Sequence, residues 1–171
     1  GVASPARNSG VNMARIRVDL DSLITARDDN SAEMQSFLDL ETGEVVVWID
    51  PNCVGDIDDA PILEELEENP RYRLIPHLDS RTGYTIMEEF TSELPTSRMK
   101  GRLIDALSGR RPFRAFKDAL LHDLGVRDLW FTFEHREKSY WAERWLREEG
   151  IEADVYDSVS ERRAELKKSK P

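Results

Sequence analysis

The chain has 171 residues, one cysteine and a formal net charge of -10 at pH 7, so it can bury one core but not two independent ones. The negative charge opposes general binding to nucleic acids. Because Cys53 is the single cysteine, the chain cannot form an intrachain disulfide. No apolar run approaches the roughly 20 residues that cross a bilayer. These features favour a cytoplasmic protein without a membrane segment.

The start of the chain divides into a segment without periodicity and a first helix. Residues 1–12 are small, polar and aperiodic, which is typical of a vector-derived leader, so we exclude them from the predicted fold. Residues 15–29 begin with an apolar alternation and continue at helical spacing, and Asp19 or Asp21 can cap the helix. We therefore expect a short extended segment that leads into a modest helix.

The clearest strand pattern is a hairpin around Gly43. Residues 34–40 and 45–50 flank a Glu-Thr-Gly-Glu loop, in which glycine supplies the positive φ that a short bulged loop requires. The second arm is apolar on both faces, so we expect it at the centre of a sheet or beneath helices. A helix at 59–69 and a strand at 71–75 are predicted to follow, which makes a sheet of at least three strands.

The second half of the chain has the longer period of helices. The predicted helices span residues 80–94, 97–108, 112–124 and 127–149. Gly125 and Gly150 are the predicted stops of the last two helices, and residues 151–156 form a predicted edge strand. An aromatic stripe on the longest helix is predicted to face the core rather than to stack on nucleic-acid bases. Its members are Trp130, Phe133, Trp141 and Trp145.

Together these elements predict a single α+β domain over residues 13–157. A small antiparallel sheet, made of the hairpin and a third strand, packs in this prediction against a helical layer from the C-terminal half. Residues 158–171 are highly charged and lack an apolar face, which is typical of a flexible tail.

Positive charge concentrates in the segment S-G-R-R-P-F-R-A-F-K at residues 108–117. Gly109 is predicted to close one helix in the left-handed conformation, and Pro112 suits the first turn of the next helix. The cations then gather at a helix N-terminus, where free N–H groups and the helix dipole favour an anion. The candidate ligand-binding residues are Arg110, Arg111, Arg114 and Lys117. They either grip an external phosphate or carboxylate or pair with the chain's own acidic groups, such as Asp105 and Asp118.

Several stretches of the sequence match a family pattern. They are F-L-D-L-E-T-G-E-V-V at 37–46, R-Y-R-L-I-P at 71–76, G-R-R-P-F-R-A-F-K-D-A-L at 109–120 and W-L-R-E-E-G-I at 145–151. With these stretches the chain resembles a bacterial family known as uncharacterised protein family 0158. It departs from that family at 125–127, where Gly-Val-Arg stands in place of a tyrosine-proline-rich bend. The family has no established activity, so the resemblance implies the domain and adds no mechanism.

The remaining polar motifs predict no catalytic site, metal site or cofactor. The loop at 50–59 starts with the ligand spacing of a calcium loop, but Val54 and Pro61 occupy later ligand positions. We expect a polar loop whose last aspartate caps the following helix. The histidines are too scattered for a metal motif, and His135 is expected on an exposed helix face. The other two are His77 and His122.

The sequence therefore favours a non-catalytic binding or regulatory module that holds an acidic partner or a phosphate-bearing ligand at residues 109–117. One alternative is a hydrolase or transferase acting on a small phosphorylated or nucleotide substrate, with Asp118 or His77 beside the arginines. Another is nucleic-acid binding through the helix pair around Gly109, which the acidic Asp118 and Asp123 oppose.

Overall fold

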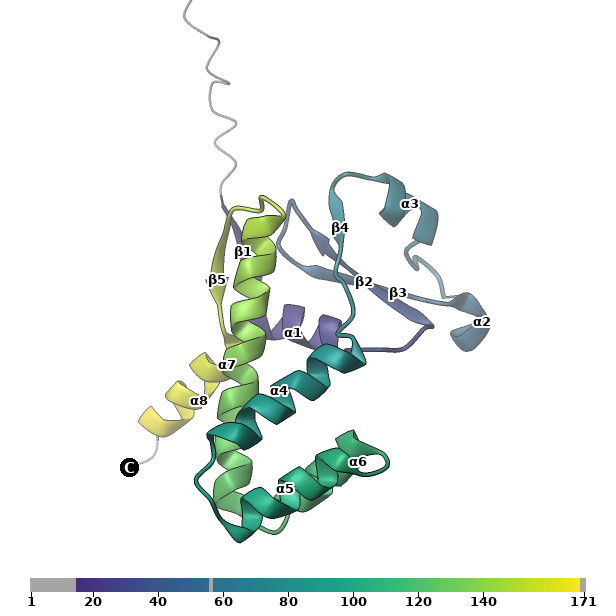
Figure 1. Ribbon diagram of the computed structural model, residues 1–171. Coiled ribbons are helices and arrows are strands. Elements are labelled where there is room, and N and C mark those ends of the chain that lie inside the picture. Colours follow the sequence, from purple (N-terminus) through teal and green to yellow (C-terminus); the bar gives the residue numbers. More distant parts are fainter. Residues whose placement is uncertain (1–14, 56, 170–171) are drawn as a thin grey trace, which may run out of the picture.

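The computed structural model describes residues 15–55 and 57–169, and the predicted leader at 1–12 lies outside them. Its longest element is helix α7 (Leu124–Glu148), which runs through the molecule (Figure 1). The two small sheets lie beside one half of α7, and the helices between residues 80 and 120 lie around its other half (Figure 1). The fold is α+β, with a small antiparallel sheet and C-terminal helices, as the sequence predicts.

The first strand and the first helix follow directly from one another. Strand β1 (Ile16–Asp19) leads into α1 (Leu20–Asp28), and the Asp19 side chain caps the helix by accepting a hydrogen bond from the Asp21 N–H. Strand β5 (Ala153–Tyr156) pairs with β1 in parallel and forms a separate two-stranded sheet. The predicted strand near 151–156 is thus present, and its partner is the other end of the chain.

The predicted hairpin is strands β2 (Met34–Asp39) and β3 (Val45–Ile49), and β4 (Tyr72–Leu74) pairs antiparallel with β2 on the other side. The order β3-β2-β4 places β3 at the edge, so the first of the two predicted positions of the second arm, at the centre of a sheet, is wrong. Its apolar residues are only partly covered, with Val47 at 38% and Ile49 at 37% exposed.

Gly43 holds the hairpin turn against the neighbouring sheet. Its φ of 80° is in the left-handed region, and a Cβ added there would lie 2.0 Å from the Arg17 carbonyl oxygen of β1. Only glycine allows this approach of two backbones. The turn therefore links the two sheets as well as the two strands of the hairpin.

The connection between β3 and β4 is less regular than predicted. It contains the short helix α2 (Pro51–Val54), capped by Asp50, and α3 (Leu63–Glu68). Helix α3 begins after residue 59, and its N-cap residue Ile62 makes no side-chain capping bond. The expectation that the last aspartate of the loop caps this helix is therefore wrong.

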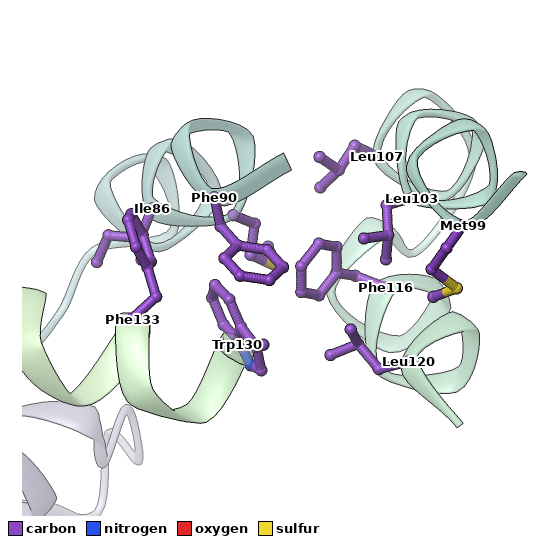
Figure 2. Close-up of a cluster of buried hydrophobic side chains, with 10 residues drawn as sticks. Ile86, Phe90, Met99, Leu103, Leu107, Phe116, Leu120, Trp130 and Phe133 are labelled. Atoms are coloured by element: carbon purple, nitrogen blue, oxygen red, sulfur yellow. The ribbon is translucent and has the colours of Figure 1, made fainter. Parts of the chain in front are cut away.

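The helical half contains α4 (Ser80–Glu93), α5 (Arg98–Ser108) and α6 (Pro112–Leu120), packed around the first half of α7. Their inward faces form a cluster of buried side chains, shown in Figure 2. Phe116 is fully buried at its centre, with its ring centroid 4.9 Å from that of Trp130 and 6.4 Å from that of Phe90. Of the predicted aromatic stripe on α7, Trp130, Phe133 and Trp145 are buried, and Trp141 is partly buried against the second core.

Helix α7 begins earlier than predicted because Asp123 caps it by accepting the Val126 N–H. Gly125 therefore lies in the first turn of α7, and the prediction that it ends the preceding helix is wrong. Gly150, with φ 69°, follows the C-terminal end of α7 as expected. The second half of α7 packs Trp145 and Leu146 into a second core, shared with β1, α1, β2 and the segment after β4.

Helix α8 (Ser158–Lys168) occupies most of the segment for which we predict a flexible tail. None of its residues is buried, in agreement with the lack of an apolar face. Its first turn is attached to α1 by polar contacts, described below. Of the helices that the structure describes, none has the length and apolar composition of a membrane-spanning segment.

Candidate functional site

The basic turn, defined as residues 109–117, joins the end of α5 to the start of α6. Gly109 has φ -97° and ψ -167°, so the predicted left-handed glycine is wrong. Arg111 takes the left-handed conformation instead, with φ 51° and ψ 57°, and it is the N-cap residue of α6. Non-glycine residues adopt this conformation at a cost, and such residues often cluster at functional sites.

All four cations of the basic turn, Arg110, Arg111, Arg114 and Lys117, are exposed. The Arg114 Nε lies 3.9 Å from Asp118 Oδ2, and the two side chains are 75% and 67% exposed, which makes this a weak pair. Within the described residues, no carboxylate lies within ion-pair distance of the other three cations. No side chain caps the N-terminus of α6 either.

Helix α4 packs against the residues on both sides of the basic turn. The Tyr84 hydroxyl donates a hydrogen bond of 2.8 Å to the Leu107 carbonyl near the end of α5. The Phe113 ring lies against Gly83, where an added Cβ would be 3.2 Å from the ring. Together with the buried Phe116, these contacts attach both helices that flank the turn. The backbone that carries the cations is therefore anchored on both sides.

A pocket of about 430 Å³ between α6 and α7 includes Lys117 and Asp118 from the basic turn and its flank. The arginines of the basic turn do not line this pocket. Its other charged lining residues are both acidic and basic. The charges are Asp28, Arg127, Glu134 and Lys138. Lys138 pairs with Asp28 at 2.7 Å and with Glu134 at 3.2 Å, so part of this charge is already neutralised internally.

A second polar cluster, which the sequence does not predict, brings together Asp21, His135 and Asp157. These residues come from α1, α7 and the residue before α8. One ligand atom of each lies within 4.8 Å of the others. The His135 Nε2 contacts Asp157 Oδ2, and its Nδ1 lies 3.8 Å from Asp21 Oδ1. His135 is partly buried, with 37% of its side chain exposed, so its helix face is less open than the sequence predicts.

Backbone amides of α8 orient the two carboxylates of this cluster. Asp21 Oδ2 accepts the Val159 N–H at 2.9 Å, and Asp157 Oδ1 accepts the Ser160 N–H at 2.9 Å. Burial and a hydrogen bond to Asp157 raise the pKa of Asp21. Burial opposes ionisation of Asp157, but hydrogen bonds from Asp21, the Ser160 amide and His135 outweigh it and hold its pKa below the usual range. Asp157 therefore ionises more readily than Asp21.

Asp19 adds a third carboxylate next to the cluster. It accepts hydrogen bonds from the Ser158 N–H at 3.2 Å and from the Ser158 hydroxyl at 2.8 Å, in addition to capping α1. Asp19 and Asp157 each stand immediately before a helix, a position in which aspartate is typical of an N-cap. The contact between Asp19 and Ser158, which are 139 residues apart, has no signal in the sequence.

The other polar residues considered from the sequence remain separate from both clusters. The His77 Nδ1 contacts the Asp29 carbonyl, and His122 is exposed between α6 and α7. Asp50 caps α2. Cys53 is exposed, and partial desolvation of its thiol followed by the negative charge of Glu33 raises the pKa of the thiol, which opposes formation of a reactive thiolate.

Comparison with known proteins identifies the family. A family model described as Uncharacterised protein family (UPF0158) matches residues 13–168, so the chain belongs to this family. A UPF0158 protein of Pseudomonas aeruginosa is 27% identical over 141 residues, which cover 82% of this chain and 88% of the relative. No solved structure matches the chain. The comparisons confirm the resemblance and assign no activity, so function is inferred from the geometry.

Proposed function

We propose that the protein is a non-catalytic binding module that holds an acidic partner or a phosphate-bearing ligand at the basic turn. The observation that carries this proposal is the lack of internal partners among the described residues for Arg110, Arg111 and Lys117. The chain contains 34 acidic residues against 24 Lys and Arg. A purely structural role for these cations would be expected to pair them with some of those acids.

The geometry of the turn supports recognition of an anion. Arg111 immediately precedes α6, Arg114 lies in its first turn, and Lys117 follows one turn later. Arginine forks bind carboxylate and phosphate oxygens through two parallel hydrogen bonds, and a helix N-terminus adds unpaired N–H groups. Because α4 supports the turn, an anion would meet cations that need little ordering.

The test is a charge reversal with a matched control. Pyrophosphate and a fluorescent hexaglutamate peptide serve as phosphate and carboxylate probes, with binding measured by calorimetry and fluorescence anisotropy. In Arg111→Glu/Arg114→Glu, we expect binding of the preferred probe to fall at least tenfold with little change in melting temperature. The control, Arg162→Glu/Arg163→Glu, makes the same change of charge on the exposed face of α8 and should bind like the parent.

Three outcomes would count against the proposal. Equal losses in both double variants would mean that the probes respond to net charge rather than to the basic turn. Unfolding of the Arg111/Arg114 variant would mean that those arginines are structural. Tighter binding of a DNA or RNA oligonucleotide than of either probe, with a steep dependence on salt, would instead favour the nucleic-acid alternative.

A further inference from the structure

We infer that Asp21, His135 and Asp157 form a binding site for a divalent transition-metal ion, independent of the basic turn. One imidazole and two carboxylates converge here from three separate segments of the chain. This combination of nitrogen and oxygen donors suits zinc, manganese or iron(II) rather than the all-oxygen environment that calcium and magnesium prefer.

The distances are compatible with one ion. Donor atoms around a tetrahedral zinc are roughly 3.4 Å apart when each metal–ligand bond is about 2.1 Å long. In the structure, the three donor atoms lie within 4.8 Å of one another. A contraction of at most about 1.4 Å therefore suffices, and rotations of the Asp21 and Asp157 side chains can supply it.

The hydrogen bonds around the cluster leave ligand atoms available. The α8 amides hold Asp21 Oδ2 and Asp157 Oδ1, so Asp21 Oδ1 and Asp157 Oδ2 face His135. Metal-binding carboxylates are commonly fixed in this way by hydrogen bonds to the second oxygen. Asp157 Oδ2 also accepts a hydrogen bond from the Ser160 hydroxyl at 3.0 Å, which uses one lone pair of this oxygen and leaves another for the ion.

The local charge also favours a cation. Asp19, Asp21 and Asp157 gather around the start of α8, and within residues 15–55 and 57–169 no Lys or Arg forms an ion pair with any of them. Three carboxylates close together repel one another, and a divalent ion removes that repulsion more completely than one imidazolium can.

A cleft of about 400 Å³ between α1 and the hairpin adjoins the cluster at Asp21, the one of the three proposed ligands that lines it. Asp19, Asp21 and Ser158 line this cleft, together with apolar side chains of β2 and β3. The side chains of Asp21 and Asp157 are 17% and 21% exposed, so the site is neither closed nor on the open surface. Three protein ligands would leave a coordination position for water.

The proposal is tested by metal titration of the 171-residue chain carrying Cys53→Ser, which removes the exposed thiol as a competing ligand. After treatment with a chelator, Co²⁺ binding is followed by its visible absorption and Zn²⁺ binding by competition. We expect one ion per chain, with a rise in melting temperature. His135→Ala should weaken binding at least tenfold and abolish that rise, because it removes the nitrogen ligand.

Two further variants separate ligation from folding. Asp157→Asn should also lose the ion, although asparagine caps α8 about as well as aspartate and should preserve that helix. His122→Ala removes an exposed histidine outside the cluster and should bind like the parent. The proposal is overturned if Co²⁺ and Zn²⁺ show no saturable binding below about 100 μM, which would correspond to a binding free energy weaker than roughly 5.5 kcal/mol. It is also overturned if His135→Ala binds as tightly as the parent.

Discussion

The basic turn and the Asp21–His135–Asp157 cluster differ in how the chain assembles them. The turn is a run of neighbouring residues, and its charges point outward. The cluster joins α1, α7 and the start of α8, and its charges meet one another. Neighbouring residues can thus form an exposed group of like charges by themselves. Acidic and basic side chains from distant segments contact one another only after the chain has folded.

The largest expected effect concerns the core on which the basic turn rests. Phe116 is fully buried and its ring packs against those of Phe90 and Trp130 (Figure 2). Phe116→Ala should lower the free energy of unfolding by about 3–5 kcal/mol, because it removes buried apolar surface and leaves a cavity. Urea denaturation measures the change.

The control is Phe113→Ala in the same helix, since Phe113 is 39% exposed. It should cost clearly less than Phe116→Ala. Equal losses in the two variants would mean that the packing of α6 does not depend on its buried face, and that the turn lacks the support described here.

The next effect concerns the long-range ion pair of the three-stranded sheet. Arg71 donates two hydrogen bonds to Asp39, at 2.9 and 2.8 Å, and these bonds lower the pKa of Asp39 to about 2. An aspartate in the unfolded chain has a pKa near 3.9, so the unfolded state binds the proton more tightly. The stabilisation, roughly 2 kcal/mol, is complete above about pH 5 and is lost as the pH falls toward 2.

Unfolding measured from pH 6 to pH 2.5 checks this pH dependence. In Asp39→Asn, the part of the acid destabilisation that comes from this group should disappear. The exposed Arg15–Asp154 pair, with side chains 57% and 65% exposed, provides the control, and Asp154→Asn should leave the pH profile close to that of the parent. A parent profile that is flat in this range would contradict the prediction.

A smaller effect tests whether the aspartates couple α8 to α1. Asp19→Ala removes the cap of α1 and the acceptors of the Ser158 amide and hydroxyl. We expect a loss of about 2 kcal/mol in stability, at the upper end for a helix cap. Amide hydrogen exchange in residues 158–168 should become faster.

Asp79→Ala is the matched change, because Asp79 caps α4 alone through the Thr82 amide and hydroxyl. It should leave exchange in α8 unchanged. If both variants speed exchange in α8 to the same extent, the effect comes from global stability rather than from the contact between α1 and α8.

The smallest effect concerns the backbone of the basic turn. Arg111 has φ 51°, a conformation that glycine adopts without strain. Arg111→Gly should therefore change stability by no more than about 1 kcal/mol, in the stabilising direction, while it weakens binding of the anionic probe. Thermal unfolding and probe titration on the same sample measure both. A clear loss of stability would show that the Arg111 side chain supports the fold.

Much of the secondary structure could be predicted because its signals are local. Apolar spacing predicts α4 to α7, and the loop around Gly43 predicts the hairpin. The helix ends that the sequence predicts wrongly are those where the position depends on which residue caps the helix. Asp123 starts α7 before Gly125 can act as a stop, and the α3 cap lacks the aspartate expected from the sequence. Propensity alone does not decide between neighbouring caps that are each acceptable.

The sequence alone determines the family, the α+β composition, the inward face of each long helix and the basic turn, since all of these are written in residues close together along the chain. Only the tertiary structure decides that β3 lies at a sheet edge, that β1 pairs with β5, and that Asp21, His135 and Asp157 meet. Those facts depend on which distant surfaces bury one another. A local sequence pattern shows that one face of a helix or strand is apolar and will be buried. It does not show which distant segment covers that face, because this depends on the fold of the whole chain.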